Sequence, residues 1–354
     1  MAACTVRQPR RILIIKPSSL GDIVHALPVL AGLRAVYPQA HIAWLVGKAF
    51  APLLAGHPLL DEVIPFDRRR YGRMLESWTV AAEFLHFVRQ LRQRRFDLVV
   101  DLQGLLRSGI LSWASGAGWR VGFAAAREFG WAFYTQRVRC PAREAHAVDK
   151  NLHLARMIGL HVDPPAFPLG LRDEELAAVR ERLTRAASRS MAHFIALVPG
   201  ARWETKRWRA DRFAELVDRL HAAGFPPCVV LGAPDDRTFA DAILAACATP
   251  VIDLVGRTSL RELSAALALA DLVVCHDSGP MHIAAALGKP LVAIFGPTSP
   301  ARTGPYCRSA RVVALPRPCV PCLQRQCPLG HYNCMQQLDV ATVLRNVREL
   351  QAHP

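Results

Sequence analysis

Residues 271–299, DLVVCHDSGPMHIAAALGKPLVAIFGPTS, have the pattern of a phosphate-binding site. The apolar run Leu272–Val274 predicts a buried strand, and Ser278 and Gly279 mark the start of a short helix that carries His282. The start of a helix presents unpaired backbone N–H groups and the positive end of the helix dipole, which suit a pyrophosphate. The next apolar run completes a β-α-β unit, so we expect an anionic ligand at this corner.

Three other polar loops follow predicted strands. They are KPSSLGD at 16–22, DLQG at 101–104 and PGARWETKRW at 199–208. In open α/β sheets, ligands bind beyond the carboxyl ends of the strands, so these loops are where a site is expected. The chain contains neither a G-x-G-x-x-G nor a G-x-x-x-x-G-K-[ST] motif, which argues against a standard dinucleotide site or P-loop.

Alternating strand and helix patterns predict an α/β fold built from two doubly wound parallel sheets. The first series of strands is expected at 12–15, 41–46, 62–66, 97–102 and 119–123, and the second at 194–198, 227–231, 251–255, 272–274 and 291–295. Helical patterns such as 23–37 and 74–94 separate them. With 354 residues, of which 51% are hydrophobic, two domains are more consistent with the length than one.

A proline-rich stretch after His161, followed by a charged helical pattern, marks the domain boundary. We predict an N-terminal domain at 1–175, a linker at 176–192, a C-terminal domain at 193–335 and a final helical segment at 336–354. The final helix carries an apolar stripe, so it should pack on a domain.

The charge balance implies a polyanionic partner. The chain has 44 Lys and Arg residues against 29 Asp and Glu residues, a net charge of +15. Nucleic acid, an anionic membrane surface and a phosphorylated ligand all fit, and an arginine-rich composition without a partner is the alternative. The interleaved aromatic and basic residues of nucleic-acid binders are not evident, so no nucleic-acid partner is expected.

No apolar run approaches the roughly 20 residues that cross a bilayer. The apolar segment near the start is also too short for a signal peptide. These two observations predict a cytoplasmic protein.

Four motifs occur in order along the chain: KPSSLGDIVHALP at 16–28, DLQGLLRS at 101–108, PGARWETKRW at 199–208 and HDSGPMHIAAALGKPLVAIFGPT at 276–298. Together they resemble bacterial glycosyltransferase family 9, the lipopolysaccharide heptosyltransferases, and the first motif is more similar to heptosyltransferase I than to II. The resemblance implies a GT-B fold, with two Rossmann-like domains facing a central cleft and a terminal helix that can cross back to the N-terminal domain. It also implies an inverting transfer that requires no cofactor for catalysis.

The resemblance assigns catalytic roles to two residues. Asp22 matches the proposed base of the family, which takes a proton from the acceptor hydroxyl as it attacks. Helix capping is the alternative role for this aspartate. Lys206 matches a lysine that stabilises the negative charge developing on the ADP leaving group.

Donor binding involves further residues around the phosphate corner. Asp277 matches a family aspartate that contacts heptose hydroxyls, a role that can coexist with helix capping. The Ser278 and Gly279 backbone supplies N–H groups to the phosphates. His282 either touches the donor phosphates or packs beneath the loop.

Acceptor binding is expected on the N-terminal half. The family places basic residues in the loop at 67–73 for the carboxylates and phosphates of an anionic Kdo–lipid A acceptor, and guanidinium groups fit such oxygens in pairs. A solvated surface loop is the alternative. The full acceptor set that the resemblance implies is Ser19, Gly21, Arg68, Arg69, Arg70, Arg73, Gln103 and Arg127.

A compact group of cysteines precedes the last helix. Cys319, Cys322, Cys327 and Cys334 have a spacing that fits structural zinc. An iron–sulfur cluster is a second interpretation, and reduced or disulfide-forming cysteines in a loop are a third. The group lies outside the four motifs, so no catalytic role is expected for it.

The sequence therefore predicts a glycosyltransferase that moves heptose from ADP-heptose to the Kdo region of the lipid A inner core, as a peripheral protein on the cytoplasmic face of the inner membrane. One alternative is a family 9 enzyme with another nucleotide-sugar donor or acceptor. Others are a non-catalytic nucleotide- or polyanion-binding GT-B protein and a nucleotide-sugar epimerase.

Overall fold

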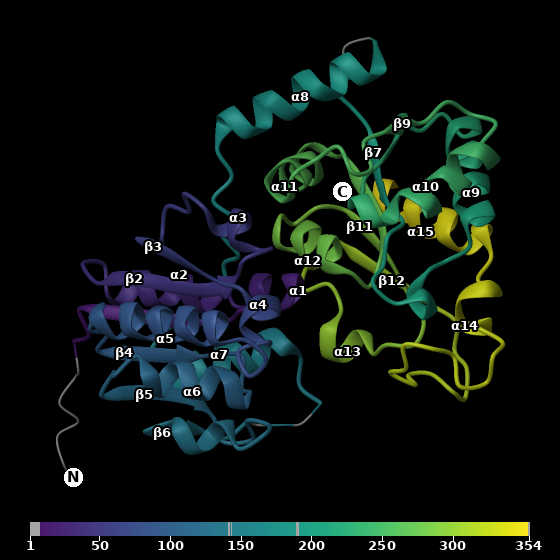
Figure 1. Ribbon diagram of the computed structural model, residues 1–354. Coiled ribbons are helices and arrows are strands. Elements are labelled where there is room, and N and C mark those ends of the chain that lie inside the picture. Colours follow the sequence, from purple (N-terminus) through teal and green to yellow (C-terminus); the bar gives the residue numbers. More distant parts are fainter. Residues whose placement is uncertain (1–7, 141, 143, 189–190, 353–354) are drawn as a thin grey trace. The chain divides into compact units, whose positions relative to one another are not determined.

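The chain forms two compact units, Met1–Gly170 and Leu171–Pro354 (Figure 1). The computed structural model describes residues 8–352 except 141, 143, 189 and 190, so the opening residues of the segment examined for a signal peptide lie outside the described residues. Each unit is built on a six-stranded parallel sheet with helices packed against it. The prediction of two Rossmann-like, doubly wound domains is confirmed.

The N-terminal sheet has the strand order β3-β2-β1-β4-β5-β6. Its strands are β1 (Arg11–Ile15), β2 (His41–Gly47), β3 (Glu62–Phe66), β4 (Leu98–Asp101), β5 (Trp119–Phe123) and β6 (Gln136–Val138). Its helices are α1 (Leu20–Val24), α2 (Leu27–Val36), α3 (Ala51–Leu54), α4 (Arg68–Tyr71), α5 (Trp78–Gln93), α6 (Leu106–Ala114) and α7 (Ala147–Met157). Strand β1 lies between β2 and β4, so its residues 12–15 are buried on both faces and form a continuous apolar run.

The C-terminal sheet has the order β12-β11-β10-β7-β8-β9. Its strands are β7 (Ile195–Val198), β8 (Cys228–Val230), β9 (Ile252–Asp253), β10 (Leu272–His276), β11 (Leu291–Phe295) and β12 (Ala310–Ala314). The helices of this unit are α8 (Asp173–Ala187), α9 (Ala210–Ala222), α10 (Arg237–Ala246), α11 (Leu260–Leu269), α12 (Gly279–Ala286), α13 (Pro300–Thr303), α14 (Asn333–Gln336) and α15 (Val340–Ala352). Both central strands, β10 and β7, are buried along their whole length.

Several element boundaries differ from the sequence predictions. Strands β6 and β12 were not predicted, because each is partly exposed and shows no clear apolar run. The helix predicted at 23–37 is two helices, since Pro28 lies in the first turn of α2, where a missing N–H costs no hydrogen bond. The helix predicted at 74–94 begins only at Trp78, after Ser77 in extended conformation.

The segment predicted as a linker at 176–192 is for the most part helix α8, which packs along α11 (Figure 1). The Arg261 guanidinium hydrogen-bonds Glu175 at the start of α8 and lowers the pKa of that carboxyl to about 2. The division between the units therefore falls at Gly170 rather than 175, and α8 belongs to the C-terminal unit. Residues 189–190 of the predicted linker lie outside the described residues.

The last helix, α15, packs within the C-terminal unit. Its apolar stripe joins the core formed by α9, β11 and β12. The expectation that a terminal helix crosses back to the N-terminal domain stays a prediction. No helix among the described residues combines the length and the apolar character that crossing a bilayer requires.

Candidate functional site

The predicted acceptor residues lie in loops at one edge of the N-terminal sheet. Because all its strands are parallel, their carboxyl ends share that edge. Ser19, Gly21 and Asp22 follow β1, the arginines at 68–73 follow β3, Gln103 follows β4 and Arg127 follows β5. The fold thus gathers four separate parts of the sequence around one surface.

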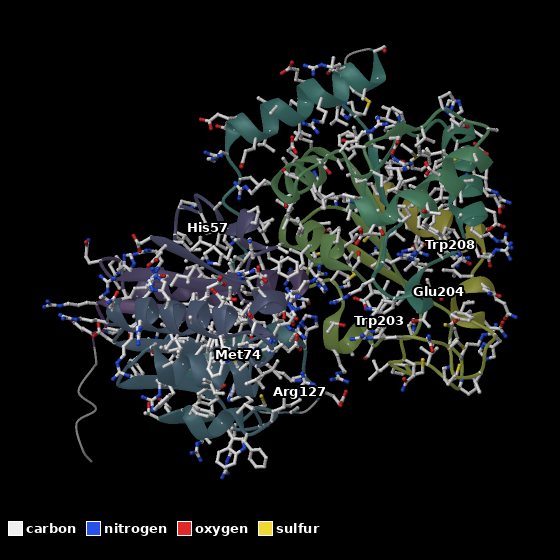
Figure 2. The ribbon with its side chains drawn as sticks, in the orientation of Figure 1. His57, Met74, Arg127, Trp203, Glu204 and Trp208 are labelled. Atoms are coloured by element: carbon white, nitrogen blue, oxygen red, sulfur yellow. The ribbon has the colours of Figure 1, made fainter. Side chains whose placement is uncertain are left out.

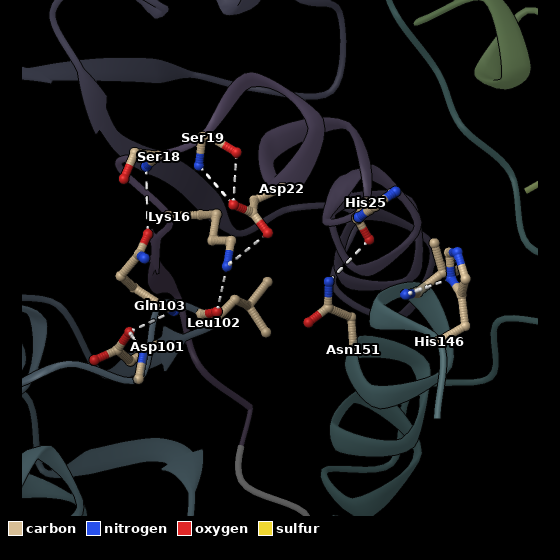
Figure 3. Close-up of polar contacts among 12 residues, drawn as sticks. Lys16, Ser18, Ser19, Asp22, His25, Asp101, Leu102, Gln103, His146 and Asn151 are labelled. Carbon is tan, nitrogen blue, oxygen red and sulfur yellow. Dashed lines mark hydrogen bonds and ion pairs between the residues drawn. The ribbon is translucent and has the colours of Figure 1, made fainter. Parts of the chain in front are cut away.

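Asp22 lies in the first turn of α1, where its two carboxylate oxygens have different partners (Figure 3). The Ser19 backbone N–H and hydroxyl donate to Oδ2 at 2.7 and 2.8 Å. Lys16 Nζ lies 3.9 Å from Oδ1. Helix capping therefore accounts for Oδ2, while Oδ1 faces the Lys16 cation. The Asp22 side chain remains 41% exposed.

Lys16 controls the charge of Asp22. Its side chain is buried at the end of β1 and its ammonium group donates to the Leu102 carbonyl at 2.8 Å. Burial raises the pKa of Asp22, but attraction to Lys16 and the hydrogen bonds from Ser19 outweigh it and hold the pKa below its ordinary value. Asp22 is therefore a carboxylate at neutral pH, as a proton acceptor must be.

The loop after β4 is organised by Asp101, a fully buried residue. Its Oδ1 accepts the Gln103 N–H at 2.8 Å, and its Oδ2 accepts the Tyr134 hydroxyl at 2.7 Å. Burial raises the pKa of Asp101 despite these bonds. The Gln103 side chain then accepts the Ser18 N–H at 3.3 Å, which joins this loop to the one that carries Asp22 (Figure 3).

Arg127 belongs to the same group of loops. Its backbone N–H donates to the Gly104 carbonyl at 2.9 Å, which ties the loop after β5 to the loop after β4. Figure 2 places the Arg127 side chain on the surface of the N-terminal unit. The predicted acceptor residues Gln103 and Arg127 are therefore brought together.

The basic loop after β3 forms helix α4, a single turn capped by Asp67, whose Oδ1 accepts the Arg70 N–H at 3.0 Å. The Arg70 side chain pairs with Glu83 on α5, so it has a structural partner. Arg68, Arg69 and Arg73 are exposed. These three, rather than Arg70, have guanidinium groups available for an anionic ligand.

On the C-terminal unit, Lys206 and Asp277 form one ion pair. Lys206 Nζ lies 2.6 Å from Asp277 Oδ2 and also donates to the Asp277 backbone carbonyl at 3.3 Å. The side chains are 16% and 7% exposed. The loops after β7 and β10 meet here because these strands are neighbours in the sheet.

Aromatic residues hold the Lys206 loop in place. The Lys206 ammonium lies 4.6 Å from the centre of the Trp203 ring, and the Trp208 backbone N–H donates to His276 Nε2 at 2.8 Å. Burial lowers the pKa of His276 to about 3, so the ring is neutral and can accept that hydrogen bond. Trp208 itself is fully buried and donates from its indole to Leu338.

Helix α12 begins beside Asp277, as predicted, with Ser278 as its N-cap residue. Among the described residues, the buried Ser278 Oγ and Thr298 Oγ1 have no hydrogen-bond partner. Thr298 follows β11, the strand next to β10. Two free hydroxyl groups and the start of a helix therefore lie at the carboxyl edge where the donor phosphates are expected. The side chain of His282, a residue of α12, is buried.

Replacing Ser278 by Ala tests this arrangement. We expect the Kd for ADP to rise about tenfold, because a hydroxyl bonded to a charged group contributes about 1.5–3 kcal/mol. The melting temperature should not fall, since this hydroxyl bonds no described residue. The contrasting variant is Thr205→Val, which removes the 2.9 Å bond from Thr205 to the Gln324 carbonyl and should lower the melting temperature. An unchanged Kd in titration calorimetry of Ser278→Ala would show that this hydroxyl does not contact the phosphates.

The cysteine segment packs against the Lys206 loop, where the Thr205 hydroxyl donates to the Gln324 carbonyl at 2.9 Å. Cys319, Cys322, Cys327 and Cys334 are free thiols that line a cavity of about 20 Å³ together with His331. Within the part of the chain that the structure describes, no three Cys, His, Asp or Glu side chains form a group that could hold a metal ion. Structural zinc and an iron–sulfur cluster are therefore not evidenced by this geometry, and reduced or disulfide-forming cysteines in a loop stay a prediction.

Sequence reasoning missed four residues that shape these sites. They are Lys16, Asp101, His276 and Thr298. Each lies at or just after the carboxyl end of a central strand, and a charged or polar residue in that position is itself an indication of a functional site. Their partners lie far away in the sequence, so only the fold identifies what they do.

Comparison with known proteins identifies the family. The model of glycosyltransferase family 9 (heptosyltransferase) matches residues 84–333. Lipopolysaccharide heptosyltransferase 1 of Pseudomonas aeruginosa is 32% identical over 320 residues, which cover 90% of this chain and 87% of the relative. The enzyme of the same name from Escherichia coli is 28% identical over 310 residues, covering 87% and 94%.

Solved structures agree with this assignment. ADP-heptose lps heptosyltransferase II of E. coli superposes with a TM-score of 0.77 at 28% identity, covering 97% of this chain and 98% of that chain. E. coli heptosyltransferase WaaC with ADP gives a TM-score of 0.76 at 26% identity, covering 96% and 99%. The predicted GT-B fold is confirmed. With its fold, its motifs and these relatives in agreement, the chain belongs to glycosyltransferase family 9, the heptosyltransferases.

Proposed function

We propose that this protein is an inverting glycosyltransferase that moves heptose from ADP-heptose to the Kdo region of a lipid A acceptor. The observation that carries the proposal is the pair of Lys–Asp sites, one in each unit, at the carboxyl edge of each sheet. One site presents an ionised carboxylate that can accept a proton. The other presents a cation beside the start of a helix, which suits a diphosphate.

Asp22 would act on the acceptor. As the acceptor oxygen attacks the anomeric carbon, its proton passes to Asp22 Oδ1, the oxygen that Ser19 leaves free. Lys16 keeps this carboxylate ionised beforehand, and the Ser19 bonds to Oδ2 hold its orientation. Arg68, Arg69, Arg73 and Arg127 would bind the carboxylates and phosphates of the acceptor.

Lys206 and helix α12 would act on the donor. As the bond between heptose and ADP breaks, negative charge grows on the diphosphate, and Lys206 and the α12 backbone N–H groups stabilise it. Asp277 would accept hydrogen bonds from heptose hydroxyls through oxygen lone pairs that Lys206 does not occupy. The Ser278 and Thr298 hydroxyls supply further donors for the phosphates.

The test measures ADP release from ADP-heptose by the purified protein, with and without de-acylated Kdo–lipid A. We expect release that depends on the acceptor, with inversion at the anomeric carbon of the product, and we expect it to persist in EDTA. Release with a different acceptor or donor sugar would instead support another family 9 activity. Tight ADP-heptose binding without turnover on any acceptor would contradict the proposal and favour a binding protein.

A further inference from the structure

The turn between α4 and α5 exposes two large apolar side chains. Leu75 is 94% exposed and Trp78 is 92% exposed, and the neighbouring Met74 is 37% exposed. Single exposed apolar residues are common on protein surfaces, but a Leu and a Trp this close in sequence and both almost fully exposed indicate an interaction surface.

The base of this turn is firmly held, so the exposure does not arise from a loose loop. Tyr71 packs against Phe66, Phe84 and Phe87, with ring centres 5.3, 5.5 and 5.6 Å apart. The Arg70–Glu83 pair joins α4 to α5. Tyr71 is thus half-buried against the core, while Leu75 is exposed.

The same turn carries exposed positive charge. Arg68, Arg69 and Arg73 are exposed on the same turn, where Glu76 is the one exposed carboxylate. The Asp67 carboxylate is partly neutralised by Lys48 at 3.7 Å. Exposed Trp and Leu flanked by arginines are the combination found at the boundary between lipid headgroups and acyl chains, where Trp is enriched and cations meet anionic lipid.

We propose that residues 68–78, the α4–α5 turn, dock this protein on an anionic bilayer, with Leu75 and Trp78 inserted at the headgroup boundary and the arginines on lipid phosphates. The inference deepens the proposed function, on which it rests, because the acceptor of that function is a lipid of the same bilayer. Docking would bring the arginines of the acceptor site to the membrane surface without a spanning helix.

Vesicle binding tests the docking itself and does not depend on transfer activity. The full-length protein is sedimented with vesicles of phosphatidylglycerol and phosphatidylethanolamine, and in parallel with phosphatidylcholine vesicles. We expect binding to the anionic vesicles only, and at least about tenfold weaker partitioning for the Leu75→Ser/Trp78→Ser variant. The matched control is Trp113→Ser on α6, since Trp113 is an exposed tryptophan of the same unit at 58% and should bind like the wild type.

Comparing a soluble acceptor with one embedded in vesicles distinguishes membrane docking from recognition of the acceptor. With de-acylated acceptor in solution, Leu75→Ser/Trp78→Ser should keep the wild-type kcat/KM, whereas with acceptor embedded in vesicles its kcat/KM should fall about tenfold or more. Both side chains are exposed, so the melting temperature should be unchanged. Vesicle binding by Leu75→Ser/Trp78→Ser equal to that of the wild type would overturn the inference. A loss of kcat/KM that is as large with the soluble acceptor as with the embedded acceptor would also overturn it. If no acceptor is turned over, the proposed function fails while the vesicle experiment still decides the docking.

Discussion

Asp22→Asn is expected to lose about 10²- to 10⁴-fold of kcat, because asparagine cannot take the proton from the attacking hydroxyl. The amide oxygen of asparagine can still accept the Ser19 bonds that hold the start of α1, so the fold and the Kd for ADP-heptose should change little. Single-turnover measurement of ADP release gives kcat, and titration calorimetry gives the Kd.

Two comparisons separate the chemical role of Asp22 from its capping role. Asp339, whose Oδ1 accepts the Thr342 N–H at 2.6 Å before α15, is also a capping aspartate, and Asp339→Asn should keep wild-type turnover. In Lys16→Met the pKa of Asp22 should rise, since burial then acts without the opposing cation. A base works only when deprotonated, so the acid limb of kcat/KM should move to higher pH. Near-normal turnover by Asp22→Asn would exclude this residue as the base.

Lys206→Met is expected to lower kcat/KM about 10²- to 10³-fold, because the charge that develops on the diphosphate loses its fixed cation. The substitution keeps an unbranched, flexible side chain but also leaves the Asp277 carboxylate, which is 7% exposed, without its partner at 2.6 Å. A lower melting temperature should therefore accompany the loss of activity.

The Lys206→Met/Asp277→Asn double variant distinguishes these two effects. It removes the unpaired carboxylate, so we expect the melting temperature to recover while the activity stays low. Arg202→Met is the matched control, because Arg202 is an exposed cation of the same loop and its loss should change kcat/KM only slightly. Equal losses for Arg202→Met and Lys206→Met would indicate a general effect of loop charge rather than a specific contact.

Much of the fold follows from local sequence patterns. The apolar runs that became β1 and β11 were predicted nearly to the residue, because a strand buried on both faces must be continuously apolar. Strands β3 and β5 were predicted with the same bounds although they are only partly buried. Strands β6 and β12 were missed because neither shows a clear apolar run, and α8, predicted as a charged helical pattern, was assigned to a linker rather than to the C-terminal unit.

The sequence by itself determined the family, the two-sheet organisation and the loops in which a site had to lie, because hydrophobic periodicity and short motifs are local properties. The pairings within each site depended on the tertiary structure. Lys206 and Asp277 lie 71 residues apart, and Asp101 and Tyr134 lie 33 apart. Strand order decides which loops become neighbours, and burial among those neighbours sets the charge of Asp22 and His276. Neither strand order nor burial is a local property of the chain, so the folded protein alone shows which side chains act together.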